Sequence, residues 1–364
     1  MPNYRSLRDF DWTLWGVTLL ICSLGVLQIY SATRDTIWRG AWTKQLLCIA
    51  AGIVLAWVVS RVDYHSLLGH VPLMYLAMMV MLMVTFVLGT KIFGSRRWIP
   101  VFGGFHLQVS EFAKLVIVLL VARFLSAVRN DRLELEDLFK LCGLVALPML
   151  LVMKQPDLGT SLTYLAVLAA GIFLVGLRWQ YVAAIVALCV LLMPAAWYFY
   201  LKDYQKARLT TFVDPERDPR GKGYQVIQSK IAVGSGGPWG KGVTKGSQTQ
   251  LQFLPVPHTD FIMAAFAEEH GFVGVVVVLG LYLLLLLQIV QNAQTAPDKA
   301  GIYICMGVGM LLLFHLLVNV GMVVGRMPVT GIPLPLMSNG GSSILTTFMM
   351  LGLVNNVRLR RFVN

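Results

Sequence analysis

Residues 254–291 read LPVPHTDFIMAAFAEEHGFVGVVVVLGLYLLLLLQIVQ. A loop with two prolines passes through His258, Thr259 and Asp260 and continues into a long apolar run at 272–291. Twenty residues of α-helix are about 30 Å long, which matches the hydrocarbon core of a bilayer. The stretch therefore predicts a membrane-spanning helix that has ionisable side chains at its entrance.

The rest of the chain repeats this apolar pattern. Of its 364 residues, 57% are hydrophobic and only 13% are charged, which excludes an ordinary soluble domain. Continuous apolar runs favour helices over a β-barrel, whose strands would alternate. The fold class we expect is an all-α polytopic membrane protein, in one domain over 1–364, with about ten spans. The runs lie at 12–31, 43–60, 72–90, 108–127, 137–153, 158–176, 179–200, 272–291, 301–324 and 335–357.

Ten spans place both termini on one side of the membrane. The first run lacks a small-residue cleavage site, so we interpret it as a retained helix and not as a cleaved signal. The only long polar stretch, 201–259, is expected to be a large loop between spans seven and eight. The five cysteines all lie in apolar runs, which predicts neither a disulfide nor a metal site.

Basic residues next to the spans indicate the orientation. Arg5, Arg8, Arg129, Lys140 and Arg358 are typical of a cytoplasmic side. The polar segments at 91–107, 154–157, 201–259 and 325–334 then share the outer face. That face also carries Lys91, Arg96, Arg97, Lys154, Lys206, Arg208, Arg217, Arg220, Lys222, Lys230, Lys241, Lys245 and Arg326. Because short outer loops are rarely so basic, an anionic substrate or lipid headgroup is expected, and not nucleic acid. The alternative is that a long loop translocates whatever its charge.

The helix entrance at Asp260 is the first candidate site. We expect Thr259 to be the N-cap and Asp260 to lie in the first turn, where the helix dipole favours a carboxylate. Glu268 would lie about 12 Å deeper and about 80° round an ideal helix, so the two cannot form a close dyad. Asp260 could act as a general base, His258 competes for that role, and pure capping explains both residues without function.

Two further segments could contribute. Trp98 could stack on a sugar ring or anchor the chain at the membrane interface. Glu111 and Lys114 share a helical face and could bind a ligand, or neutralise each other as an ion pair. Asp157 in KQPDLGTS could serve the site or cap a helix.

Late in the chain, GRMPVTGIPLPLMSNGGSS at 325–343 interrupts an apolar run and brings Ser338, Asn339 and Ser342 into the last span. Small residues here could let helices approach closely. The functional alternative is a discontinuous helix whose freed amides face an anionic group.

Taken together, these motifs resemble the SEDS family (shape, elongation, division, sporulation), and its RodA branch more than its FtsW branch. The resemblance covers nearly the whole chain, including the ten-helix count. One departure is Asn339, where the family usually has tyrosine. The matching stretches are GSRRWI at 94–99, QVSEFAK at 108–114, QPDLGTSL at 155–162, GYQVIQSKIAVGSGGPWGKG at 223–242, HTDFIMAAFAEEHG at 258–271 and MPVTGIPLPLMSNGGSS at 327–343.

The resemblance implies a peptidoglycan glycosyltransferase that polymerises lipid II on the outer face of the bacterial cytoplasmic membrane. Asp260 matches the essential aspartate of the family, and Trp98, Glu111, Lys114 and Asp157 match cavity residues. The implied partners are a class B penicillin-binding protein that supplies transpeptidation, and MreC and MreD of the elongation machinery. Membrane lipids surround the chain.

The expected mechanism has Asp260 remove or orient the proton of the acceptor 4-hydroxyl, which attacks the donor anomeric carbon and displaces undecaprenyl pyrophosphate. Lys114 and Arg208, with Arg217 or Arg220, would stabilise the leaving group, and Ser338 and Ser342 would bind substrate. Mg²⁺ or Mn²⁺ could share this task, although no residue pattern specifies a metal site.

Two alternatives belong to other classes of protein. A lipid II flippase would need polar groups through the full depth of the membrane, whereas the polar residues here concentrate on the outer side. An ion-coupled transporter would use Glu111, Lys114 and Asp157 as a proton path, but the sequence shows no internal repeat.

Overall fold

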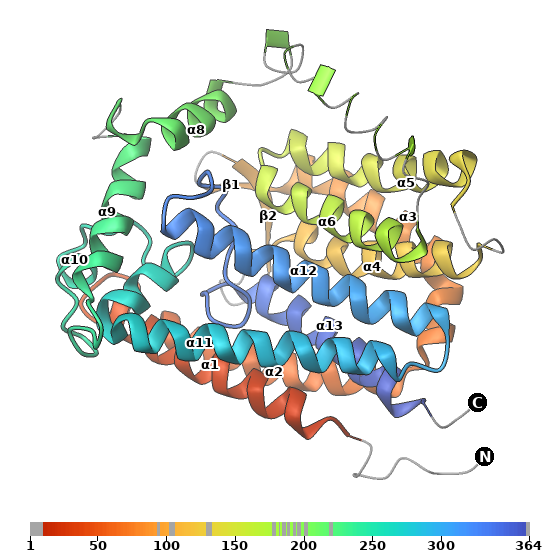
Figure 1. Cartoon of the computed structure of the whole chain (residues 1–364), viewed down its shortest axis with the longest axis horizontal. Helices are drawn as coiled ribbons and strands as arrows, with labels where there is room; N and C mark the ends of the chain where they lie inside the picture. Colours follow the sequence, from red (N-terminus) through yellow and green to blue (C-terminus); the bar gives the residue numbers. More distant parts are fainter. Residues whose placement is uncertain are drawn as a thin grey trace.

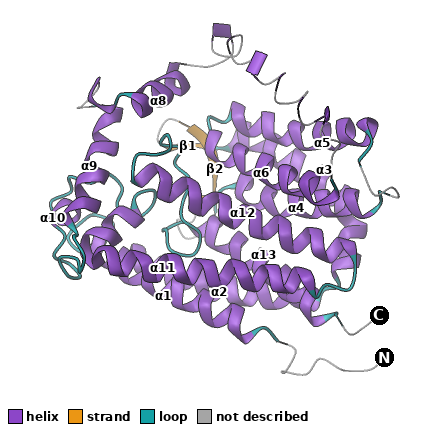
Figure 2. Cartoon of the chain, viewed as in Figure 1, coloured by secondary structure: helices purple, strands orange, loops and turns teal. Residues whose placement is uncertain are grey.

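The computed structural model of the chain is a bundle of long helices that run side by side, with a small sheet at one end (Figures 1 and 2). It describes residues 10–92, 95–101, 106–128, 133–176, 203–217 and 221–361, and isolated positions between 180 and 199. The first and last described residues, 10 and 361, lie at the same end of the bundle (Figure 1). We call this the terminal end, and the opposite one the Asp260 end.

Nine of the described helices form the bundle. Six of them, α1, α2, α3, α6, α11 and α12, are long and apolar enough to cross a membrane, so the chain is a multi-pass helical membrane protein. The span expected at 179–200 lies largely outside the described residues. The nine are α1 (Trp12–Thr33), α2 (Ala41–Arg61), α3 (Tyr64–Leu88), α4 (Val109–Ser126), α5 (Leu135–Lys154), α6 (Leu158–Val175), α11 (Ile262–Gln294), α12 (Lys299–Val323) and α13 (Gly341–Leu359).

Three helix boundaries differ from the predicted runs. Helix α3 starts at Tyr64, where the Asp63 carboxylate accepts a bond from the His65 amide, and not at 72. Helix α11 starts at Ile262 and continues through a kink at Gly271, whose φ of 68° interrupts the helical backbone. Helix α13 starts at Gly341 and not at 335, because Leu336 has a φ of 69°.

The 201–259 segment, predicted as a loop, is largely helical where it is described. It contains α8 (Asp203–Val213), the 3-10 turn η3 (Pro215–Arg217), α9 (Lys222–Ser235) and α10 (Ser247–Gln250). Figure 1 shows α9 and α10 gathered at one end of the bundle, with α8 above them. Ser229 on α9 donates to the carbonyl of Val323 on α12 at 2.8 Å, which connects this segment to the bundle.

A three-stranded antiparallel sheet stands between α3 and α4 at the same end. Its strands are β1 (Thr90–Ile92), β2 (Ser95–Pro100) and β3 (His106–Leu107), in the order β1-β2-β3. Trp98 of β2 pairs with Thr90, and Ile99 pairs with Leu107. Arg97 and Trp98 are thereby placed beside the entrance of α4.

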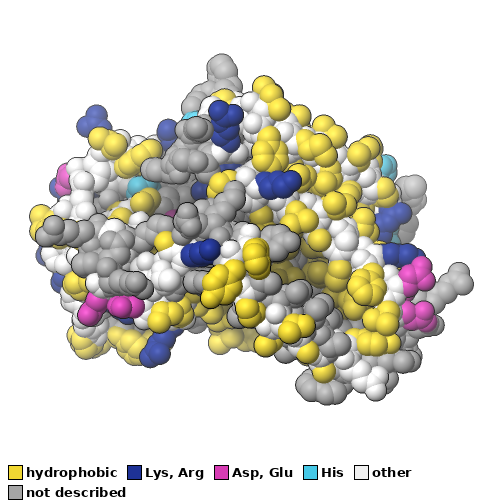
Figure 3. All heavy atoms as spheres, turned by 90° about the horizontal axis from the view of Figure 1, so that it is seen from above, with side chains coloured by type: hydrophobic (Ala, Val, Ile, Leu, Met, Phe, Trp, Pro, Cys, Tyr) yellow, Lys and Arg dark blue, Asp and Glu magenta, His cyan; other side chains and the backbone are white. Residues whose placement is uncertain are grey.

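The outside of the bundle is strongly apolar. From above, hydrophobic side chains cover much of the visible face (Figure 3). Leu73 on α3, Phe139 on α5 and Phe272 on α11 are each about two-thirds or more exposed. A soluble monomer rarely exposes an apolar surface of this extent, so it is the lipid-facing surface of a membrane bundle.

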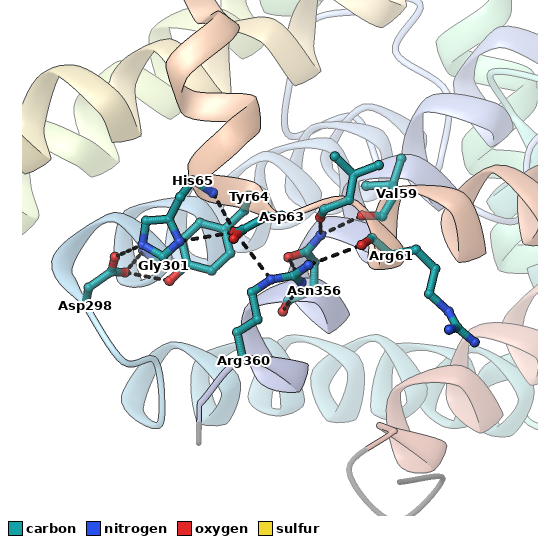
Figure 4. A network of polar contacts seen from close by, with 10 residues as sticks. Val59, Arg61, Asp63, Tyr64, His65, Asp298, Gly301, Asn356 and Arg360 are labelled. Carbon is teal, nitrogen blue, oxygen red and sulfur yellow. Dashed lines mark hydrogen bonds and ion pairs between the residues drawn. The ribbon is translucent and has the colours of Figure 1, made fainter. Parts of the chain in front are cut away.

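The terminal end is closed by two polar networks. Asp11 is fully buried and accepts from Gln288 and Asn292 of α11 and from Arg358 of α13, at 3.0 Å for the arginine. In the second network, His65 lies between Asp63 and Asp298, and Arg360 contacts Asp63 at 3.3 Å (Figure 4). The first network joins the residue before α1 to α11 and α13, and the second joins the end of α13 to the starts of α3 and α12.

Helices α2 and α13 pack backbone to backbone. A Cβ added at Gly352 would lie 2.7 Å from the carbonyl oxygen and 2.9 Å from the Cα of Ala56. Ser60 on α2 also donates to the Gly352 carbonyl at 3.1 Å. Only a residue without a side chain permits this approach.

We therefore expect Gly352→Ala to lower the melting temperature of the purified protein in detergent, because the backbones must separate, at a cost of about 1–3 kcal/mol. Gly280→Ala on α11 is the matched control, since a Cβ there meets nothing within 4 Å. An equal melting temperature for both variants would contradict the close packing.

Candidate active site

The loop before α11 is held in a non-helical conformation. The N-cap of α11 is Phe261, with no side-chain capping bond, so the prediction that Thr259 caps this helix and that Asp260 lies in its first turn is wrong. Two prolines and a φ of 46° at Val256 keep this part of the chain in turns. Asp260 therefore precedes the helix and its carboxylate does not cap it.

Three consecutive carbonyls of this loop accept hydrogen bonds from elsewhere in the chain. The His258 carbonyl accepts from the Asn339 amide at 2.9 Å, and the Thr259 carbonyl from the Ser338 hydroxyl at 2.7 Å. The Asp260 carbonyl accepts from the side-chain amide of Asn319 on α12 at 2.9 Å. The loop is thus fixed against α12 and against the 327–340 segment.

The Asp260 carboxylate is partly buried in a charged setting. Burial raises the pKa of Asp260, the Asp157 carboxylate acts in the same direction, and the guanidiniums of Arg97 and Arg208 oppose the rise. A Cβ at Gly331 would lie 3.4 Å from Asp260 Oδ2, so this glycine leaves the carboxylate beside open backbone. Asp260 is a carboxylate whose proton affinity is raised, as a general base requires.

The competing base, His258, is buried and lies beside Trp38, with ring centroids 5.7 Å apart and the ring planes tilted by 35°. Burial lowers the pKa of His258 to about 4. Its imidazole is therefore neutral at physiological pH, and a base with so low a pKa is weak.

Asp157 caps a helix and also joins two other elements to it. As predicted, it caps α6, where it accepts from the Thr160 amide at 3.2 Å. It also pairs with Arg97 of β2 at 3.2 Å and accepts from the Gln108 side chain at 2.7 Å. The sheet and the start of α4 are thereby bound to the start of α6.

Glu111 and Lys114 form the predicted ion pair at 2.7 Å, and both are almost completely buried. His315 on α12 lies 3.3 Å from the Lys114 ammonium. His315 and Asn319 were not predicted, although the detectable signal was a pair of polar residues inside the apolar run at 301–324.

The other predicted residues lie at the same end but are engaged with the protein. Arg208 on α8 donates to the Thr330 carbonyl at 3.1 Å. The Ser338 hydroxyl also accepts from the Leu334 amide, and the Ser342 hydroxyl accepts from the Gln108 amide at 2.9 Å. Trp98 is partly buried under the Arg97 guanidinium, 5.9 Å from its ring centre. Arg220 and the side chain of Arg217 lie outside the described residues.

Asp260 differs from three other acidic residues at this end, which form ion pairs. Asp157, Glu111 and Glu268 pair with Arg97, Lys114 and Lys241 respectively. No ion pair involves Asp260 in the described part of the chain, and no group of three His, Cys, Asp or Glu side chains gathers there as a metal site. Glu269, which also lacks an ion pair among the described residues, accepts from Ser31, Gln28 and Gln250. Asp260 has neither an ion pair nor such a set of long-range hydrogen bonds to its carboxylate in that part of the chain.

The sequence model of the cell cycle proteins that include FtsW, RodA and SpoVE matches residues 11–361. This chain belongs to that family. It is 36% identical to the peptidoglycan glycosyltransferase MrdB of Escherichia coli K12, over 99% of this chain and 97% of the relative. It is 32% identical to the peptidoglycan glycosyltransferase RodA of Treponema pallidum, over 98% and 99% respectively.

Solved structures of the family share the fold. A chain of a peptidoglycan synthase complex that coordinates polymerization and crosslinking superposes with a TM-score of 0.84, at 35% identity, over 98% of this chain and 99% of the other. Crystalline RodA of Thermus thermophilus gives a TM-score of 0.72 at 30% identity, over 99% of both chains.

The buried pair on α4 generates a stability prediction. We expect Lys114→Met to destabilise the folded protein by about 3–5 kcal/mol, because it leaves the Glu111 charge buried without its partner. Glu111→Gln/Lys114→Met should recover most of that loss, since no charge remains. Melting temperatures in detergent check both, and a double variant no more stable than the single one would contradict the pairing.

Proposed function

We propose that this chain is a peptidoglycan glycosyltransferase that polymerises lipid II into glycan strands during cell elongation and releases undecaprenyl pyrophosphate. The names of the relatives and the structural neighbour support the activity. The observation that carries the assignment of the site is Asp260, a partly buried carboxylate with a raised pKa that neither caps a helix nor forms an ion pair among the described residues.

In the reaction, Asp260 accepts or orients the proton of the 4-hydroxyl on the acceptor N-acetylglucosamine. The hydroxyl oxygen forms a bond to the donor anomeric carbon, and the bond from that carbon to the pyrophosphate breaks with its electron pair. A base is more effective when its pKa lies nearer the working pH, so the raised pKa of Asp260 assists proton transfer.

Charge develops on the departing pyrophosphate, so fixed cations contribute most in the transition state. Arg208 and Arg97 suit this role because both act on the Asp260 carboxylate. Lys114 is neutralised by Glu111 and contributes less than its charge alone predicts. Trp98 and Asp157 line the same end as substrate-binding candidates. A divalent cation such as Mg²⁺ or Mn²⁺ could add charge neutralisation.

The topology that fits this reaction has ten spans in one domain, with the Asp260 end on the outer face of the bacterial cytoplasmic membrane. The basic residues near the terminal end, including Lys140 and Arg358, support that orientation. A class B penicillin-binding protein is the proposed partner, in keeping with the solved synthase complex. MreC and MreD are proposed as components of the same machinery.

Replacing the base is the direct test. Asp260→Asn keeps the shape but cannot accept the proton, so polymerisation of purified lipid II should fall at least about 100-fold. Asp35→Asn is the matched control, because Asp35 is an exposed aspartate in the turn between α1 and α2. Gel analysis of the glycan products measures both variants.

Two results would oppose the proposal, one from this assay and one from a translocation assay in vesicles. Folded Asp260→Asn protein that makes glycan chains at the wild-type rate removes the base assignment. Wild-type protein that moves fluorescent lipid II across vesicles without polymerising it would indicate a flippase instead.

The pH profile of kcat/KM gives a second test. Activity should fall as the pH drops through the raised pKa of Asp260, because protonation removes the base. Arg97→Gln should move this acid limb to higher pH, since Arg97 holds that pKa down. His258→Gln should leave the limb in place; a limb that follows His258 and ignores Arg97 would transfer the role of base to the histidine.

A further inference from the structure

Helix α12 carries two buried polar side chains on an otherwise apolar stretch. His315 and Asn319 are one turn apart, 2% and 0% exposed, and have no role in the proposed chemistry. His315 contacts Lys114, whereas Asn319 contacts the loop that carries Asp260. The position of Asn319, behind the proposed base, calls for a physical explanation.

The side-chain amide of Asn319 connects two non-helical segments. Its nitrogen donates to the Asp260 carbonyl and to the Ile332 carbonyl, at 2.9 Å each. Both donors of the amide are therefore used. The orientation is determined by these bonds, because a flipped amide would place its oxygen against two carbonyl oxygens.

The same two bonds hold the backbone of Asp260 and the backbone of Ile332, which lies next to the Asp260 carboxylate. Ile332 follows Gly331, the residue whose added Cβ would lie 3.4 Å from Asp260 Oδ2. The carbonyl of Thr330, the residue before Gly331, accepts a hydrogen bond from Arg208. The Arg208 guanidinium in turn lowers the pKa of Asp260. Asn319 thus sets Asp260 against the backbone and the cation that define its surroundings.

Stability alone does not explain this amide. The Oδ1 atom of Asn319 is buried and has no hydrogen-bond partner among the described residues. Buried polar atoms are nearly always paired, and an unpaired one costs stability. The unpaired oxygen lowers the free energy of unfolding, and the two donated bonds must offset that loss. Both bonds are made to backbone beside the proposed base.

Nothing in α11 can replace this contact. The helix begins after Asp260, at Ile262, and its Ala264 and Ala265 amides bond to the Phe261 carbonyl. The His258 and Thr259 carbonyls are held by residues 338–339, which are themselves non-helical, whereas Asn319 belongs to a long regular helix. Of these three bonds to the loop, the one made to Asp260 itself has its donor inside a helix.

We propose that Asn319 is a positioning residue of the transferase, which holds the Asp260 carboxylate in its reactive place without touching substrate. This inference rests on the proposed function of Asp260. A misplacement of about 1 Å can cost about 100-fold in rate, so loss of the two bonds should reduce turnover strongly. Substrate affinity should change little, because the contacts to lipid II come from other residues.

The test compares kcat, KM and melting temperature for Asn319→Leu, which keeps the volume and removes both donors and the unpaired oxygen. We expect kcat per folded protein to fall at least about tenfold and KM to stay within about threefold, while the melting temperature falls because the Asp260 and Ile332 carbonyls lose their donor. Asn319→Asp has the shape of the native side chain and, as a protonated carboxyl, can donate at most one of the two bonds, so it serves if the leucine variant does not fold.

The matched control is Asn355→Leu. Asn355 is equally buried, on α13 at the terminal end, where it contacts Ser60 and the Asp11 amide. We expect this variant to melt earlier and to retain wild-type kcat per folded protein. Folded Asn319 variants with wild-type kcat, or with a changed KM alone, would overturn the positioning role.

Asp260→Asn in the same assay separates the two proposals. If it is inactive and the Asn319 variants are fully active, only the positioning role fails. If Asp260→Asn polymerises lipid II normally, the base assignment fails, whatever the Asn319 variants show.

Discussion

Non-helical backbone inside a membrane bundle must find its hydrogen-bond partners within the protein, because lipid offers none. The loop at 254–261 and the segment at 327–340 meet this constraint by bonding to each other and to α12. Asn339, Ser338 and Asn319 supply the donors for three successive carbonyls. The position of Asp260 ahead of its helix, the late start of α13 and the open backbone at Gly331 all depend on this interlock.

Ion pairs separate the carboxylates that stabilise the fold from Asp260, the proposed base. Arg97 binds Asp157 and so holds the sheet against α6, while Lys114 binds Glu111 within α4. Glu268 pairs with Lys241 and accepts from the amides of Gln248 and Thr249, which fixes the start of α10 on α11. These carboxylates are each committed to a partner that stabilises the fold. Asp260 is left at the centre of the same polar region with guanidiniums near it and no ion pair among the described residues.

Prediction from residues succeeded where the signal was local. Apolar runs located the helices because a helix in lipid must be long and continuously apolar. The i to i+3 spacing predicted the Glu111–Lys114 pair, and the proline before Asp157 indicated a helix start. The capping propensity of threonine wrongly predicted Thr259 as the N-cap of α11. The loop is held instead by hydrogen bonds from residues far away in the chain, such as the one from Ser338 to the Thr259 carbonyl. The short helices within 201–259 were not predicted, since they are too polar to be recognised by hydropathy.

The sequence by itself determined the membrane class, most of the spans and the residue types gathered at one end, because composition and periodicity act over short stretches of chain. Only the tertiary structure decided which of those residues are used up by other contacts. Ser338 and Ser342 are bonded to the distant backbone of Thr259 and Gln108, and Asn319, which its apolar run did not mark as a site residue, donates to the Asp260 carbonyl. Those contacts join segments up to more than 200 residues apart, and no local pattern encodes them.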